Sequence, residues 1–444
     1  MENKRTETAY KVKRSIPFLG EKTVIRKQTK GVEEMLCPKH GEETLVTMRN
    51  VDITYGSGVK AFRAVIDLNL NIYKGEVLGL VGESGSGKST TGRALVGLVP
   101  YSFGEIKLLD KTLPKKIARG FKVGKKLQEY KAIENFLINK VQMIFQDPAN
   151  SLNPYANVES IVGEGLTNTK NSKEIYLYNI DQEVKRKIYA ELCLEHHPQF
   201  FGEYEANLDV EIAKDEFSAY QAFYEDFYQK IIATDNSYLI EMMQQAKRER
   251  DELNKLSEKE CKRLLVRDIL QSVGLDQSVL RRYPLEFSGG QQQRIGISRA
   301  VVLRPQLLVA DEPISALDVS IQAQVVNIFN ELKEKYQLTI LFIAHDLRMV
   351  EYISDRIAVM NKGRLLEVGK TEEIMKHSLH PYTKSLLDAV PSIEGSKGSL
   401  IGYVYDINMH NYSAQNQPEW VKINEDHFVL GTPKEVENWK NGIY

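Results

Sequence analysis

Alternation of apolar and polar residues predicts strands in the first part of the chain. Residues 45–55 alternate loosely and residues 66–72 (IDLNLNI) alternate strictly, as strands with one buried face do. Residues 77–81 form a compact apolar run between glycines, which predicts a fully buried strand. Further buried strands are expected at 141–145, 307–310 and 339–344. Because helical stretches separate these runs, the sequence predicts an α/β domain with a mainly parallel sheet.

Residues 171–261 interrupt this design with an aromatic-rich, charged stretch. Its rings recur at roughly helical spacing, at Phe217, Tyr220, Tyr224, Phe227 and Tyr228. That spacing predicts one aromatic helix face, and a second helix is expected at 238–256. We expect the rings to pack a small helical subdomain; a peptide- or partner-binding surface is the alternative.

Charge and the two chain ends add further expectations. The 444 residues carry 59 Lys and Arg against 60 Asp and Glu, which excludes a globally basic nucleic-acid binder and an acidic disordered protein. Residues 1–44 are basic and lack apolar periodicity, so they predict a flexible tail. The alternative is an arm that touches anionic lipid headgroups or a partner subunit. Residues 391–444 form a C-terminal extension without a predicted role.

Cysteine usage and hydropathy indicate the compartment. The three cysteines, Cys37, Cys193 and Cys261, are widely spaced and form no CxxC pair, which argues against a disulfide framework or a zinc site and fits a reducing compartment. Residues 1–15 lack the apolar region of a signal peptide, and no apolar run approaches the ~18 residues of a membrane helix. A partner is therefore expected to supply any membrane part.

A glycine-rich loop follows the buried run 77–81. It matches GxxxxGK[ST] and comprises Gly82, Glu83, Ser84, Gly85, Ser86, Gly87, Lys88 and Ser89, with Thr90 opening a predicted helix at 90–98. Glycines permit close backbone approach, so successive N–H groups and the helix N-terminus can face phosphate oxygens. We expect Lys88 to reach the β- and γ-phosphates of ATP and the Ser89 hydroxyl to bind Mg²⁺.

Two acids end the apolar run 307–310. Asp311 and Glu312 are expected at the C-terminal edge of the sheet, beside the phosphate loop. Asp311 would hold Mg²⁺ directly or through water. Glu312 would accept a proton from the water that attacks ATP.

Further motifs resemble those of the ATP-binding cassette (ABC) family. The run Phe287-Ser288-Gly289-Gly290-Gln291-Gln292-Gln293-Arg294 is similar to the family's signature motif. The resemblance implies that Ser288, Gly289, Gly290 and Gln291 close on the γ-phosphate of a nucleotide held by a second ATPase subunit. It also implies a P-loop NTPase fold, with a RecA-like, mainly parallel sheet core, an antiparallel β subdomain and a helical subdomain.

The other family landmarks occur in order. Gln146 resembles the Q-loop residue that senses Mg²⁺ and contacts the membrane subunit, and Asp318 resembles the D-loop aspartate. His345 resembles the switch histidine that binds the γ-phosphate. Tyr55 resembles the aromatic residue that stacks on adenine, with Phe62 as the alternative and an edge-strand tyrosine as the structural interpretation.

Finer resemblance points to the oligopeptide/dipeptide importer ATPases, and within them to the OppF-type subfamily. It rests on the runs 146–154, 311–324 and 380–387, and covers residues 45–170 and 262–390 of a nucleotide-binding domain at 45–390 with the insert 171–261. It implies a heterodimer with a sister ATPase and two transmembrane permeases, on the cytoplasmic face of the membrane. It also implies an extracellular substrate-binding protein that acts indirectly, and no nucleic acid.

Three alternatives stay open at this point. Importers of nickel, dipeptides or glutathione share these motifs. A soluble ABC ATPase outside transport would need long heptad arms or two cassettes, neither of which the chain has. A regulatory subunit that binds ATP without hydrolysis is disfavoured by Glu312.

Overall fold

The computed structural model describes residues 9–16, 20–39, 41–117, 124–194, 220–388, 405–413 and 415–444. The chain forms two compact units, one from residues 1–148 and 305–444, the other from residues 149–304. In the described part of the chain, no helix has the length and apolar character to cross a membrane.

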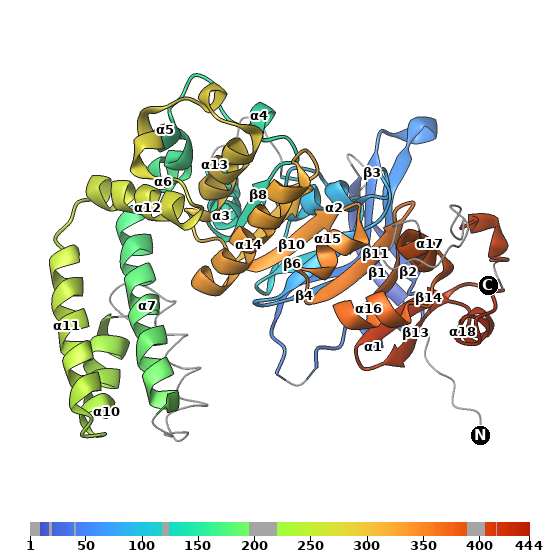
Figure 1. Cartoon of the computed structure of the whole chain (residues 1–444). Coiled ribbons are helices and arrows are strands. Elements are labelled where there is room, and N and C mark those ends of the chain that lie inside the picture. The colour runs from blue at the N-terminus through green and yellow to red at the C-terminus, as the bar shows by residue number, and fades with distance from the viewer. Residues whose placement is uncertain are drawn as a thin grey trace. The chain divides into compact units, whose positions relative to one another are not determined.

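An eight-stranded sheet forms the centre of the first unit (Figure 1). Its order is β13-β14-β12-β11-β5-β10-β9-β8, in which β11, β5, β10, β9 and β8 run parallel and the other three are antiparallel. Every residue of β5, β9 and β10 is buried, as the apolar runs predict. The predicted α/β fold class is therefore confirmed. The strands are β5 (Val77–Val81), β8 (Val141–Ile144), β9 (Leu307–Asp311), β10 (Thr339–Ala344), β11 (Arg356–Asn361), β12 (Arg364–Lys370), β13 (Glu419–Asn424) and β14 (His427–Gly431).

A second, four-stranded antiparallel sheet has the order β4-β3-β6-β7. It confirms the antiparallel β subdomain, although β4 begins four residues before the predicted strand 66–72. Its strands are β3 (Thr44–Tyr55), β4 (Phe62–Tyr73), β6 (Phe103–Leu108) and β7 (Lys111–Thr112). The helices of the first unit are α1 (Val32–Met35), α2 (Lys88–Leu95), α3 (Lys125–Lys140), α14 (Val319–Tyr336), α15 (Leu347–Glu351), α16 (Thr371–His377), α17 (Pro381–Asp388) and α18 (Pro433–Lys440).

The N-terminal segment contains regular structure where a flexible tail is expected. Strands β1 (Ala9–Ile16) and β2 (Gly20–Lys27) pair in an antiparallel hairpin, so these residues of the predicted flexible tail have regular secondary structure. The sequence analysis overlooks a short alternation in β1, in which Tyr10, Val12 and Ile16 are separated by polar, mostly basic residues.

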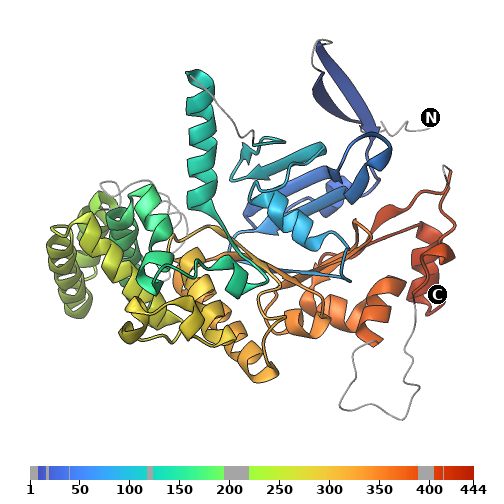
Figure 2. The ribbon, with the colours of Figure 1, turned by 90° about the horizontal axis from the view of Figure 1, so that it is seen from above.

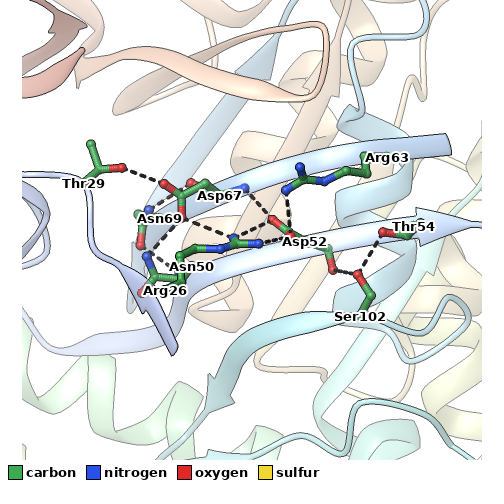
Figure 3. A network of polar contacts seen from close by, with 9 residues as sticks. All are labelled: Arg26, Thr29, Asn50, Asp52, Thr54, Arg63, Asp67, Asn69 and Ser102. Atoms are coloured by element: carbon green, nitrogen blue, oxygen red, sulfur yellow. Dashed lines mark hydrogen bonds and ion pairs between the residues drawn. The ribbon is translucent and has the colours of Figure 1, made fainter. Parts of the chain in front are cut away.

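Ion pairs join the end of this hairpin to the antiparallel sheet (Figure 3). The Arg26 guanidinium donates to the Asp52 carboxylate over 3.0 Å, and Arg63 donates to the same group over 2.9 Å. Burial opposes ionisation of Asp52, but its hydrogen bond from Arg26 prevails and lowers its pKa. Thr29 donates a further hydrogen bond to Asp67 over 2.7 Å. The N-terminal segment is thus anchored by an ion pair between the partly exposed Arg26 and the buried Asp52 carboxylate.

The second unit is helical. Helices α7 and α11 pack side by side in it (Figure 1 and Figure 2). It contains α5 (Val158–Val162), α6 (Glu164–Thr169), α7 (Ser172–Leu194), the π-helical segment η3 (Gln221–Phe227), α10 (Tyr228–Ile232), α11 (Ser237–Leu253), α12 (Glu258–Ser272), η4 (Gln277–Arg281), η5 (Pro284–Glu286) and α13 (Gly289–Val301), while α4 (Pro148–Ser151) lies at its boundary.

The aromatic residues of the insert pack inward. Phe223, Tyr224 and Phe227 are buried together with apolar residues of α7 and α11, and the rings of Phe223 and Phe227 stack at 5.6 Å. The interpretation of the rings as a subdomain core is supported for these positions, while Phe217 lies outside the described residues. Phe223, which the sequence analysis does not name, also lies in this core, within the π-helical segment η3.

The C-terminal extension packs around a buried histidine. The rings of His410 and Trp439 lie 5.5 and 5.2 Å from the ring of His380, which is 1% exposed. Burial lowers the pKa of His380 to about 3, with a smaller contribution from His410 that Glu435 opposes.

This histidine predicts acid sensitivity. Since the folded-state pKa lies below the ordinary value of 6.5, the unfolded chain binds a proton that the folded chain resists. Stability is then lost as the pH falls below 6.5, by up to about 1.4 kcal/mol per pH unit. Thermal unfolding of the wild type from pH 7 to 4 should show a steeper decline than that of His380→Asn, whose amide oxygen can still accept from the Tyr382 N–H. Parallel declines would contradict the assignment.

Candidate nucleotide site

The phosphate loop connects β5 to α2. Gly87 is the N-cap of α2 with a φ of 103°, and Gly85 has a φ of 80°, conformations that glycine adopts without strain. Ser86 and Gly87 are buried, whereas Ser84 and Gly85 are exposed. The loop therefore has the backbone form expected of an anion cradle, with the helix N-terminus behind it.

Lys88 lies inside this loop and is 3% exposed. Its Nζ donates to the carbonyls of Gly82 and Glu83 over 2.6 and 2.8 Å and to the Ser86 hydroxyl over 3.3 Å. Burial lowers the pKa of Lys88, while the nearby carboxylates of Glu312 and Asp311 act in the opposite direction. Ser89 and Thr90 follow it in the half-buried first turn of α2.

Asp311 ends β9 and is 1% exposed. Neither carboxylate oxygen accepts a hydrogen bond from the described residues, and the nearest cation is the Arg93 guanidinium, 3.6 Å from Oδ2. A buried carboxylate without hydrogen-bond donors is costly unless a further cation binds it. The environment of Asp311 therefore fits a metal ion.

Glu312, Gln146 and His345 come together at the carboxyl ends of neighbouring strands. Gln146 Nε2 donates to Glu312 Oε2 over 3.0 Å, and His345 Nδ1 lies 3.7 Å from the same oxygen. They follow β8, β9 and β10, which are adjacent in the sheet. Glu312 has a φ of 46°, a strained conformation for a residue with a side chain, and its N–H donates to the Ile343 carbonyl over 3.0 Å. The fold thus brings together the three polar groups that the sequence places far apart.

Tyr55 lies at the end of β3, 42% exposed, and its hydroxyl is 3.4 Å from the Thr90 hydroxyl. Phe62, the alternative, pairs with Tyr55 across the strands and is 64% exposed. Both rings are accessible to a planar ligand, and Tyr55 is in contact with α2. The assignment of Tyr55 to adenine stays a prediction.

The signature residues lie in the second unit, at the start of α13. Ser288 is its N-cap and forms a capping box with Gln291, in which the Gln291 N–H donates to the Ser288 hydroxyl over 3.4 Å. Gly289 and Gly290 are the first helical residues. In the first unit, Asp318 is the N-cap of α14, and its carbonyl accepts from the N–H groups of Ile321 and Gln322. Both motifs stand at helix starts.

Comparison with known proteins identifies the family. A family model described as "ABC transporter" matches residues 65–315, more than half of the chain. The chain belongs to the ABC transporter family. A second model, "Oligopeptide/dipeptide transporter, C-terminal region", matches residues 366–414. The similarity to this transporter family therefore extends beyond residue 390, the last residue that the sequence analysis includes in the resemblance.

Two relatives narrow the placement within the ABC family. The chain is 38% identical over 404 residues to the "Oligopeptide transport ATP-binding protein OppF" of Streptococcus pyogenes serotype M1, covering 90% of this chain and 99% of that protein. It is 38% identical over 400 residues to the "Dipeptide transport ATP-binding protein DppF" of Lactococcus lactis subsp. cremoris, covering 89% and 96%. The chain thus belongs with the ATP-binding proteins of oligopeptide and dipeptide ABC transporters. A solved structure of cbiO1 from Clostridium perfringens, part of the ABC transporter complex cbiONQ, is 20% identical, with a TM-score of 0.49 and coverage of 76% of this chain and 92% of that chain.

The sequence analysis does not identify two residues that contact the ABC motifs. Arg93, on α2, approaches Asp311, and Tyr382, on α17, contacts Glu83 of the phosphate loop. Tyr382 lies in the run 380–387, on which the family resemblance partly rests. That run was the sequence feature that could have pointed to this residue. Its contact with a loop 299 residues earlier is a property of the fold.

Proposed function

We propose that this chain is the ATP-hydrolysing subunit of a membrane ABC importer for oligopeptides. The observation that carries the proposal is the group formed by Glu312, Gln146 and His345, at the sheet edge that also bears the phosphate loop. A chain that only binds ATP would not need a carboxylate held there in a strained backbone conformation.

Mg²⁺ fits the residues present. Asp311 offers a buried carboxylate without a hydrogen-bond donor among the described residues, Ser89 offers a hydroxyl in the first turn of α2, and Gln146 offers an amide oxygen. Oxygen ligands of this kind suit the ion. When bound, Mg²⁺ would neutralise charge on the phosphates.

Hydrolysis is then divided among the protein groups. The loop amides of residues 82–90 and Lys88 hold the phosphates, with Tyr55 against adenine. Glu312 accepts the proton of the attacking water, Gln146 orients that carboxylate through its hydrogen bond, and His345 binds the γ-phosphate.

A second ATPase subunit completes the cycle. Its Ser-Gly-Gly-Gln surface would close on the γ-phosphate held by Lys88, and the surface formed by Ser288, Gly289, Gly290 and Gln291 of this chain would serve the sister site, with Asp318 at the interface. The closed dimer persists while the phosphate bridges both subunits, and hydrolysis removes that bridge. The resulting change of population drives the permeases.

The partners and the substrate follow the names of the relatives. The chain would lie peripherally on the cytoplasmic face of the cell membrane, bound to two transmembrane permeases and a sister ATPase, with an extracellular substrate-binding protein as an indirect partner. Oligopeptides are the proposed cargo because OppF proteins and the C-terminal family model carry that description, and dipeptides are the second candidate because of DppF.

Uptake by cells that lack only this chain tests the cargo. Labelled tetrapeptide, dipeptide and Ni²⁺ are supplied separately, and the chain is restored from a plasmid. We expect restored uptake of the tetrapeptide and little change in Ni²⁺. Restoration of Ni²⁺ uptake alone would overturn the peptide assignment and leave the ATPase assignment standing.

A further inference from the structure

A tyrosine near the C-terminal end of the chain touches the phosphate loop. The hydroxyl of Tyr382, on α17, accepts a hydrogen bond from the Glu83 N–H over 2.9 Å. The side chain of Tyr382 is 1% exposed, so the acceptor of this hydrogen bond is buried, whereas Glu83 is exposed. A residue outside the nucleotide motifs thus holds part of the loop.

The same peptide group also carries Lys88. The Gly82 carbonyl and the Glu83 N–H belong to one planar unit. Lys88 Nζ donates to that carbonyl over 2.6 Å, while Tyr382 accepts from the N–H. Because the plane is rigid, a rotation that weakens one contact also moves the other. Tyr382 and Lys88 are therefore linked through a single peptide.

Neighbouring backbone also approaches the loop at Gly82 and Ser86. Gly82 has a φ of 154°, and a Cβ added there would lie 2.0 Å from the Met360 carbonyl oxygen. The Gly363 N–H donates to the Ser86 carbonyl over 2.9 Å. The end of β11 and the turn to β12 thus pack against the phosphate loop through backbone atoms. Tyr382 adds a side-chain contact to the same loop.

Tyr382 is itself held by the C-terminal extension. Its ring packs edge-on against Tyr405 at 5.4 Å, and the Tyr405 hydroxyl is 3.0 Å from His410 Nε2. His410 Nδ1 lies 2.9 Å from the carboxylate of Glu435, on α18. Burial raises the pKa of Tyr382 to about 12, so its hydroxyl stays neutral at physiological pH.

We propose that Tyr382 is a positioning residue for nucleotide binding, which the C-terminal extension presents to the Gly82–Glu83 peptide so that the loop is preorganised around Lys88. The inference rests on the proposed ATPase function. Ordering the loop before ATP arrives removes a cost that binding would otherwise pay.

Tyr382→Phe isolates the hydroxyl and keeps the ring against Tyr405. The loss of one hydrogen bond at the loop should weaken ATP binding by about 3- to 10-fold. The KM for ATP should rise by the same factor and kcat should change little, because Glu312, Gln146 and His345 are untouched. A purely structural tyrosine would not separate KM from kcat in this way.

Tyr101→Phe is the matched control. Tyr101 is 5% exposed and its hydroxyl donates to the Leu113 carbonyl over 2.6 Å, away from the phosphate loop. Calorimetric titration of the full chain with ATP and Mg²⁺, together with thermal unfolding without nucleotide, compares both variants with the wild type.

The outcomes separate the inference from the function. The expected result is that both variants lose some thermal stability and only Tyr382→Phe loses ATP affinity. Unchanged or tighter ATP binding by Tyr382→Phe, with a wild type that binds ATP, would overturn the positioning role alone. A wild type that binds no ATP would instead overturn the proposed function.

Discussion

Replacement of Glu312 by Gln is expected to reduce ATP turnover of the assembled transporter by about 10²- to 10⁴-fold. Glutamine keeps the size of the side chain and can still meet Gln146, but it cannot accept the proton of the attacking water. ATP affinity should be largely retained, because Lys88 and the loop amides are unchanged. The closed dimer should then persist longer, since its bridging phosphate is not removed.

The control for this variant is Glu351→Gln. Glu351 ends α15, six residues after His345, and is exposed to solvent. The substitution Glu351→Gln removes one carboxylate from the same region without changing the nucleotide site, so ATP turnover should stay near that of the wild type. ATPase assays and nucleotide-dependent dimerisation measure both effects. Wild-type turnover in Glu312→Gln would show that another group acts as the base.

Replacement of Asp181 by Asn is expected to destabilise the helical insert by about 3–5 kcal/mol. Asp181 and Arg250 are each 1% exposed, and Arg250 Nε donates to Asp181 over 3.0 Å. The Tyr224 hydroxyl donates to the same carboxylate over 2.9 Å. Asparagine leaves the guanidinium buried without its counter-charge, so the packed helices α7 and α11 should open more readily.

Hydrogen exchange of the amides in α7 and α11 reports this opening directly. Glu183→Gln is the matched control, because it removes an exposed ion pair with Lys187 on the same helix. That variant should exchange like the wild type, as surface pairs contribute little. Equal protection in Asp181→Asn and the wild type would contradict the role of the buried pair.

The sequence predicts the site where its signals are local. The apolar runs of β5, β9 and β10 identify buried strands, and the glycines of the loop identify the strand-to-helix connection that follows β5. The capping box of Ser288 and Gln291 is also a local contact, which the sequence analysis does not predict. In the strands and the loop, the local sequence is sufficient because burial of apolar side chains and the backbone freedom of glycine decide the local structure.

The sequence does not predict features that depend on distant partners. The hairpin of β1 and β2 carries only a short apolar alternation, at Tyr10, Val12 and Ile16, among basic residues, and its end is held through Arg26 by Asp52. Glu312 combines a strained backbone conformation with a hydrogen bond from its N–H to Ile343 in the adjacent strand β10. Tyr382 meets Glu83 only because α17 folds back onto the loop. Such contacts join residues that no local pattern connects.

Coupling of ATP hydrolysis at this chain to peptide import is the central claim. The most direct measurement is ATP-dependent accumulation of a labelled oligopeptide in proteoliposomes that contain the permeases, the sister ATPase, the substrate-binding protein and this chain. We predict accumulation with the wild-type chain and none above background with Glu312→Gln. Equal accumulation with both, or accumulation without this chain, would contradict the account.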